Sequence, residues 1–305
     1  MSNKTNYFDV IIIGGGPAGM SAAIRCAELG IDAILLERGA ELGGQLLWTY
    51  NAIDNYSPFK AKNGRELRDH FLRRIENVGA KYLTNSPVAH ADLREKIITL
   101  ANGERFSAKS IILATGVRRR RLNVPGEKEF QRHGILESGI KDKEKVRGKT
   151  VVIVGGGDAA VENACILGEV AQKVYVVHRR DQFTAQTRFV DRVYKLTNVS
   201  VVFDSRVTSI LGDTKVGAVD VQNLMSGDHS TIPAEAVLIR IGVVPNTELF
   251  AGQIDVDHAG FALPANGIQT NVSEIYAVGD LSNPNDLTVQ AAAKSGTESA
   301  RRTKI

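Results

Sequence analysis

The sequence predicts an α/β fold with two Rossmann-like domains. Three observations support this: a glycine-rich turn at 14–19 between a strand-like and a helical run, a second such turn at 155–160, and a further strand-like run after each. The turns begin 141 residues apart, and the ends of the two further runs, Glu37 and His178, are separated by the same 141 residues. One glycine motif alone is weak evidence, but two βαβ units in one internal register indicate two dinucleotide-binding domains. The alternative for either unit is a tight turn without a ligand.

Length and composition are those of a globular protein with room for two domains. The chain has 305 residues, of which 43% are hydrophobic and 24% charged. The formal net charge of +4 is too small to indicate a nucleic-acid partner. No apolar stretch approaches the ~20 residues of a membrane span, and no apolar leader precedes the first strand-like run, so we expect a cytoplasmic protein. The six histidines show no metal-ligand spacing, so no metal is expected.

The first unit reads as strand, turn, helix, strand. An apolar run at 8–13 leads directly into the turn, a helical run follows to Leu29, and a second strand at 32–36 ends at Glu37. The glycines give a tight turn and let the backbone approach a pyrophosphate, which then lies on free N–H groups at the helix N-terminus. A carboxylate at the end of the second strand accepts hydrogen bonds from a ribose. The residues predicted to hold this dinucleotide are Gly14, Gly16, Pro17, Ala18, Gly19, Glu37 and Arg38.

The second unit repeats this order with a different strand end. The strand 150–154 leads into the turn, and the strand 173–177 ends in His178-Arg179-Arg180. Guanidinium groups in place of a carboxylate suit the 2′-phosphate of NADPH. The alternative is a solvated basic strand end, and Asp181 neutralises part of the charge, so NADH stays open as the donor. The residues predicted to hold the nicotinamide nucleotide are Gly155, Gly157, Asp158, Ala159, His178, Arg179 and Arg180.

These residues, in this order, resemble the low-molecular-weight thioredoxin reductases and their ferredoxin–NADP reductase relatives, over essentially the whole chain. The segments that carry the resemblance are GGGPAG at 14–19 with Glu37, GGQL at 43–46, IDNY at 53–56, ATG at 114–116, GGGDAAVE at 155–162, HRRDQF at 178–183, the return linker 242–246, YAVGD at 276–280, and Gln290-Ala291.

The resemblance implies a discontinuous FAD-binding domain, 1–117 and 248–305, interrupted by an NAD(P)H-binding domain, 118–247. It also implies a homodimer whose domains rotate about the two linkers. Further FAD-binding residues implied by the family motifs are Gly44, Gln45, Leu46, Asn55, Val88, Ala114, Thr115, Gly116, Gly279, Asp280, Gln290 and Ala291.

The chain departs from this family where thioredoxin reductases carry their redox CxxC. Ser138-Gly139-Ile140-Lys141 stands there, followed by the family's acid as Asp142. Disulfide exchange requires a thiolate, so serine and lysine cannot take part in it. Cys26 and Cys165 fall in predicted helices and are expected to be buried and unreactive. We therefore expect that the protein does not reduce thioredoxin by the usual route.

Other departures concern the donor and the flavin. Thr184 replaces a phosphate-binding arginine that is frequent in the family, which weakens the NADPH preference, and Val289 replaces an arginine before Gln-Ala. The family's ferredoxin–NADP reductases place an aromatic ring over the flavin from a C-terminal extension, and the sequence ends at Ile305 without one. Trp48 is expected near the flavin loop, where it shields or stacks near the flavin or serves as an interface or packing aromatic.

The arginine run 118–121 allows two interpretations. As a docking patch it would attract an acidic electron carrier. As a linker with some of its arginines in ion pairs it would have no partner, and this second interpretation is favoured.

The predicted activity is that of an FAD-dependent NAD(P)H oxidoreductase. Hydride passes from NADPH to FAD, and electrons then leave for a non-dithiol acceptor: ferredoxin, flavodoxin or a small molecule such as a quinone, free flavin or oxygen. No catalytic side chain is expected beyond the flavin, because the cofactor carries the chemistry. The alternative is a flavin- or nucleotide-binding redox sensor with little turnover.

Overall fold

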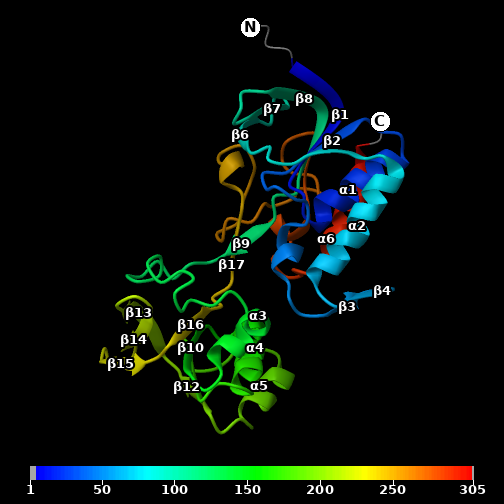
Figure 1. Ribbon diagram of the computed structural model, residues 1–305. Helices are drawn as coiled ribbons and strands as arrows, with labels where there is room; N and C mark the ends of the chain where they lie inside the picture. Colours follow the sequence, from blue (N-terminus) through cyan, green and yellow to red (C-terminus); the bar gives the residue numbers. More distant parts are fainter. Residues whose placement is uncertain (1–4, 304–305) are drawn as a thin grey trace. The chain divides into compact units, whose positions relative to one another are not determined.

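The computed structural model describes residues 5–303, and the chain divides into two compact units (Figure 1). The first unit runs to Arg118 and resumes at Val244, and the second is the insertion Arg119–Val243. The expected domain boundaries are 117/118 and 247/248. The strands β9 (Val117–Arg119) and β17 (Val243–Pro245) pair with each other and carry the chain across both unit boundaries.

The first unit is built on a mainly parallel sheet. Its strand order is β5-β2-β1-β8-β7-β6, with β18 also paired to β8. Neighbours among β1, β2, β5, β8 and β18 run parallel, while β6 and β7 form an antiparallel edge. The strands are β1 Thr5–Ile13, β2 Ala33–Leu36, β5 Lys81–Leu83, β6 Val88–Asp92, β7 Ile97–Leu100, β8 Arg105–Leu113 and β18 Ile275–Ala277.

Helices cover one face of this sheet (Figure 1). Val10 and Ile12 of β1 belong to the core under these helices, whereas Ile11 and Ile13 belong to a second core on the opposite face. Successive side chains of a strand point to opposite faces, so the unbroken apolar run of β1 marks a strand buried on both sides. The helices are α1 Pro17–Glu28, α2 Gly64–Val78 and α6 Val289–Arg302, and the shorter elements are η1 Gly44–Trp48, the hairpin β3 Ile53–Tyr56 with β4 Phe59–Ala61, η3 Glu248–Phe250 and η4 Gly279–Leu281.

The second unit repeats the plan with a smaller parallel sheet, in the order β12-β11-β10-β16. Val151 and Ile153 of β10 pack toward α4, and Val152 and Val154 pack toward an antiparallel sheet, β13-β14-β15. The elements are α3 Gly139–Asp142, η2 Lys143–Val146, β10 Thr150–Val154, α4 Asp158–Gly168, β11 Lys173–Val177, α5 Thr187–Val193, β12 Val199–Val202, β13 Ser205–Gly212, β14 Val216–Asn223, β15 His229–Pro233 and β16 Ala236–Ile239.

Both units place a glycine turn at a topological switch point. In the first unit β1 is flanked by β2 and β8, and in the second β10 is flanked by β11 and β16. The chain leaves each central strand through its glycine turn, and in such sheets ligands bind in the crevice at the carboxyl ends of these strands. The predicted α/β class with two Rossmann-like units is confirmed.

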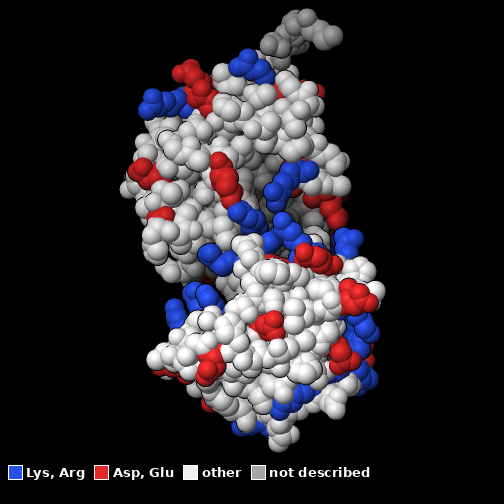
Figure 2. Space-filling model, turned by 90° about the vertical axis from the view of Figure 1, so that its left-hand side faces the viewer, with Lys and Arg blue, Asp and Glu red and all other residues white. Residues whose placement is uncertain are grey.

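Charged side chains of both signs are distributed over the surface. On the face drawn in Figure 2, Lys and Arg side chains are interspersed with Asp and Glu. Within residues 5–303, no helix combines the length and the apolar character needed to cross a membrane.

Candidate functional site

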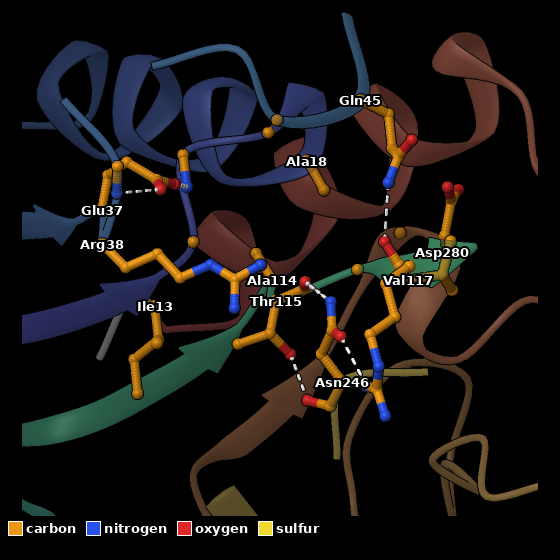
Figure 3. A pocket seen from close by; sticks show the side chains of 18 of the residues that line it. Ile13, Ala18, Glu37, Arg38, Gln45, Ala114, Thr115, Val117, Asn246 and Asp280 are labelled. Carbon is orange, nitrogen blue, oxygen red and sulfur yellow. Dashed lines mark hydrogen bonds between the residues drawn. The ribbon is translucent and has the colours of Figure 1, made fainter. Parts of the chain in front are cut away.

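A cavity of about 1280 Å³ opens in the first unit at the carboxyl ends of its parallel strands (Figure 3). It is lined by the glycine turn, the end of β2, η1, the segments 86–91 and 114–118, and the region around η4. Most of the residues predicted to bind FAD line it: Gly14, Gly16, Pro17, Ala18, Glu37, Arg38, Gly44, Gln45, Leu46, Val88, Ala114, Thr115, Gly116, Gly279 and Asp280.

Four residues of the predicted FAD set do not line this cavity. Gly19 is buried, and a Cβ on it would lie 1.9 Å from the carbonyl oxygen of Gly14, so this glycine permits helix–strand packing. Asn55 lies exposed on β3. Gln290 lines a different cavity on another side of α6, and the Ala291 N–H instead bonds Thr288 Oγ1, which caps that helix. Val289 and Ala292 are the α6 residues at the predicted flavin cavity.

The glycine turn fits a pyrophosphate. Gly14 has φ +108°, and a Cβ on it would lie 2.4 Å from the carbonyl oxygen of Ala114. Gly16 behaves differently, because the nearest atom to a Cβ there would be 4.0 Å away. Gly16 therefore leaves space at the N-terminus of α1, where free N–H groups and the helix dipole favour an anion.

Glu37 is held in place at the end of β2 by backbone donors. The Gly15 N–H and the Gly39 N–H each donate to one of its carboxylate oxygens, both at 2.7 Å. A carboxylate has about four acceptor positions, so lone pairs remain for ribose hydroxyls. Arg38 lines the cavity next to it (Figure 3).

The sequence did not predict a network of hydrogen bonds at the start of β9. Thr115 Oγ1 donates to the Asn246 carbonyl and the Asn246 side-chain amide donates to the Thr115 carbonyl, each at 2.8 Å (Figure 3). Arg118 donates to Asn246 Oδ1 at 2.8 Å, and Gln45 Nε2 donates to the Val117 carbonyl at 2.7 Å. Asn246 is 131 residues from Thr115, so no local pattern reveals the pair.

Asp280 carries the most perturbed carboxyl group at this cavity. Burial, and then the nearby Asp286, raise its pKa to about 6. A carboxyl group in this state is poised between hydrogen-bond donor and acceptor near neutral pH. It lies on η4 beside Gly279, whose N–H bonds Ser295 of α6.

The second glycine turn has the same backbone plan but different neighbours. Gly155 has φ +136°, and a Cβ there would lie 2.0 Å from the carbonyl oxygen of Arg240. Gly157 leaves open space, with Thr184 Oγ1 as its nearest neighbour at 3.8 Å from such a Cβ. Asp158 accepts the backbone N–H of Gln186 at 2.7 Å, which fixes the following loop.

Of the three basic residues that follow β11, the histidine is buried and the two arginines are exposed. His178 is buried with its ring against Gly156, where a Cβ would approach the ring within 2.4 Å. Burial, and then Arg180 and Arg179, lower the pKa of His178, so its imidazole is neutral at pH 7. Arg179 and Arg180 are exposed, and they are the groups here that are available to a phosphate. Ala159 is exposed on α4, and its carbonyl bonds Asn163.

The segment at the family's CxxC position is held by hydrogen bonds and contains no thiol. Burial raises the pKa of Asp142, but hydrogen bonds from Lys145 and from the N–H groups of Ser138 and Glu137 outweigh it and hold the pKa below its ordinary value. The Gly139 N–H donates to Asn163 Oδ1 at 2.7 Å, which fixes α3 to α4.

Both cysteines of the chain are buried and free, one in each unit. Burial raises the pKa of Cys26 to about 12 and also raises the pKa of Cys165. Neither side chain is a thiolate at neutral pH.

Hydrogen bonds involve three arginines of the run 118–121. Arg118 pairs with Glu248, Arg119 donates to the Glu137 carbonyl, and Arg120 donates to the Val243 carbonyl. These bonds favour the linker interpretation over a docking patch.

Trp48 lines the predicted flavin cavity with 54% of its surface exposed, so it does not serve as a core residue.

Comparison with known proteins places the chain in a family. Residues 8–296 match the family described as pyridine nucleotide-disulphide oxidoreductase. The chain belongs to this family. It is 34% identical over 282 residues to a thioredoxin reductase of Listeria innocua, covering 92% of this chain and 88% of that protein. It is 36% identical over 299 residues to a thioredoxin reductase of Rickettsia prowazekii, covering 95% of each.

Solved structures agree with this family assignment. A thioredoxin reductase of Lactococcus lactis superposes with a TM-score of 0.87 at 32% identity, covering 97% of each chain. The family and its oxidoreductase class are therefore as predicted, and the family's cofactors, FAD and NADPH, confirm the cofactor prediction. These relatives are named as thioredoxin reductases, not as ferredoxin or flavodoxin reductases.

Gly16→Ala and Gly19→Ala separate binding from folding. We expect Gly16→Ala to keep wild-type stability but to lower FAD affinity at least tenfold, because its Cβ enters only the space for the pyrophosphate. Gly19→Ala forces a backbone clash, so it should lose about 1–3 kcal/mol of unfolding free energy. Urea unfolding and flavin content of the purified variants measure both effects. Wild-type flavin content in Gly16→Ala would contradict the site.

Asp280→Asn should stabilise the flavin-free protein at high pH. The unfolded carboxyl loses its proton near its ordinary pKa of 3.8, and the folded one near 6, so between these values the folded state binds more protons and its stability falls as pH rises. Asparagine removes this cost, which reaches about 3 kcal/mol above pH 6. The urea midpoints of the wild-type protein and the Asp280→Asn variant should coincide near pH 4, and near pH 8 that of the variant should be higher. Asp54→Asn removes the same charge at an exposed position and is the control.

Proposed function

We propose that the protein is an FAD-dependent NAD(P)H oxidoreductase that delivers electrons to an acceptor without a dithiol of its own. The observation that carries this is the pairing of two intact dinucleotide turns with Ser138 and Lys141 at the CxxC position. The carboxylate of Asp142 already accepts hydrogen bonds from two backbone N–H groups and from Lys145, and both cysteines are buried. Since no thiolate is available, electrons leave the flavin directly.

The residues of the chain act in this proposal by binding and orientation. FAD, when bound, supplies the hydride chemistry between nucleotide and acceptor. The turn at 14–19 binds the pyrophosphate of FAD, Glu37 binds its ribose, and Asp280 contacts its ribityl–phosphate region. Domains 1–117 with 248–305 hold FAD, and 118–247 holds the nicotinamide nucleotide, at Gly155, Gly157, Arg179 and Arg180.

The missing dithiol limits the acceptors to those that take electrons directly from a flavin. A ferredoxin or flavodoxin accepts electrons from a flavin without disulfide chemistry and fits the resemblance to ferredoxin–NADP reductases. Small acceptors such as quinones fit the same requirement. The protein is proposed to work as a homodimer.

Arg179→Ala combined with Arg180→Ala tests the donor. Each guanidinium supplies charge-assisted hydrogen bonds to the 2′-phosphate, so the double variant should raise the KM for NADPH roughly 100-fold and leave that for NADH unchanged. Anaerobic bleaching of the flavin band by each nucleotide measures this. Arg192→Ala removes an ion-paired arginine elsewhere on the second unit and is the matched control. Equal use of both nucleotides by the unmutated protein contradicts the NADPH assignment, and failure of both to bleach the flavin favours a sensor.

Cys26→Ser combined with Cys165→Ser tests electron transfer without thiols. We expect NADPH oxidation with ferricyanide to continue at the wild-type rate, because both thiols are buried with raised pKa values. The wild-type protein should reduce neither thioredoxin nor an aromatic disulfide with NADPH. Loss of ferricyanide reduction in a folded, flavin-loaded double variant would show that a cysteine participates.

A further inference from the structure

A second cavity, of about 850 Å³, lies in the first unit and is lined by residues of α1, α2, α6 and the β3–β4 hairpin. Helix α6 contributes to both cavities with different side chains. Val289 and Ala292 line the predicted flavin cavity, whereas Gln290, Ala293 and Lys294 line the second one. A volume of this size is typical of small-molecule sites, and the proposed flavin and nucleotide functions leave it unused.

The lining of this second cavity carries an excess of positive charge. Its described residues include two carboxylates, Glu28 and Glu298, and five cationic side chains, Arg25, Arg74, Lys294, Arg301 and Arg302. Glu28 pairs with Arg25 and Arg74, both at 3.0 Å, and Glu298 pairs with Arg302 at 3.1 Å and Arg301 at 3.7 Å. Lys294 has no ion pair among residues 5–303. Five cations against two carboxylates give the lining a net charge of +3, which favours an anion.

Neutral rings line the same cavity. His70 packs against Phe59 with ring centroids 4.4 Å apart, and Tyr56 is also part of the lining. Burial, and then Arg73 and Arg74, lower the pKa of His70, so this imidazole adds no charge at neutral pH. Buried Ile24 and Ala293 complete an apolar wall. Flat rings beside cationic side chains match a ligand in which a planar ring carries an anionic group.

The charge balance argues against self-association through this cavity. In an isologous dimer whose two-fold axis passed through this cavity, two equally charged patches would face each other. Repulsion between them would require an anion in between, whereas a small anionic ligand in each cavity balances the charge directly.

We propose that the second cavity binds a small ligand that links an aromatic ring to phosphate groups through a short polar spacer, such as a nucleoside phosphate. The phosphates lie against Arg74 and Lys294, and the ring lies against the wall formed by Tyr56, Phe59 and His70. This site is independent of the two glycine turns.

Calorimetric titration of FAD-loaded protein tests this site. ADP is the probe, and the parent protein carries Gly157→Ala, whose Cβ occupies the space left for a pyrophosphate at the second glycine turn. In this parent, adding Arg74→Ala and Lys294→Ala should weaken ADP binding at least tenfold while flavin content stays unchanged. Adding Lys143→Ala and Arg192→Ala instead removes the same charge from side chains paired with Glu169 and should leave ADP affinity unchanged.

Two further measurements locate the ligand and test its ring. ADP should slow amide exchange in α6 and in the β3–β4 hairpin, and inorganic pyrophosphate should bind at least tenfold more weakly than ADP. Equal affinity for pyrophosphate and ADP overturns the ring contact. Affinity that is insensitive to Arg74→Ala and Lys294→Ala, or equally sensitive to the control pair, overturns the site. A change of oligomeric state in the Arg74 and Lys294 variants without ADP binding identifies the cavity as an interface and also overturns it.

Discussion

The close approach of backbone to backbone at the two glycine turns is the constraint on which the rest of the molecule depends. A Cβ on Gly19 would lie 1.9 Å from the Gly14 carbonyl oxygen, and one on Gly155 would lie 2.0 Å from the Arg240 carbonyl oxygen. The atoms that would clash are backbone carbonyl oxygens, which cannot move aside as a flexible side chain can. The helices α1 and α4 can therefore start directly behind their strands only because these positions lack a Cβ. This places each helix N-terminus at the crevice where the parallel strands end.

The two units use the same turn with different electrostatics. In the first, Glu37 accepts N–H groups from both sides of the turn and presents a carboxylate to the cavity. In the second, the equivalent His178 is buried as a neutral ring against Gly156, and its neighbours Arg179 and Arg180 remain in solvent. Under the proposed function, the backbone sets where a pyrophosphate fits, and the strand end sets which nucleotide binds there.

The segment 138–142 keeps a hydrogen-bonded local structure without thiols. Asp142 caps the N–H groups of Glu137 and Ser138, and Asn163 holds Gly139, without any contribution from sulfur. These bonds maintain α3 with serine and lysine in the positions where the family's thioredoxin reductases carry cysteines. The segment therefore keeps its local structure without a dithiol, and under the proposed function the flavin is the last electron carrier within the chain.

The sequence by itself determined the local features: two strand–turn–helix units, the apolar strands, the acidic and basic strand ends, and most of the glycine and Ala-Thr-Gly residues at the first cavity. These follow from backbone conformation and periodicity, which neighbouring residues encode. Tertiary structure alone decided that Gln290 faces away from the predicted flavin cavity, that Asn246 bonds Thr115 across 131 residues, and that Asp280 has a raised pKa. Which side of α6 meets which cavity, and how deeply a carboxyl group is buried, depend on elements packed against them from distant parts of the chain, and no local pattern records those neighbours.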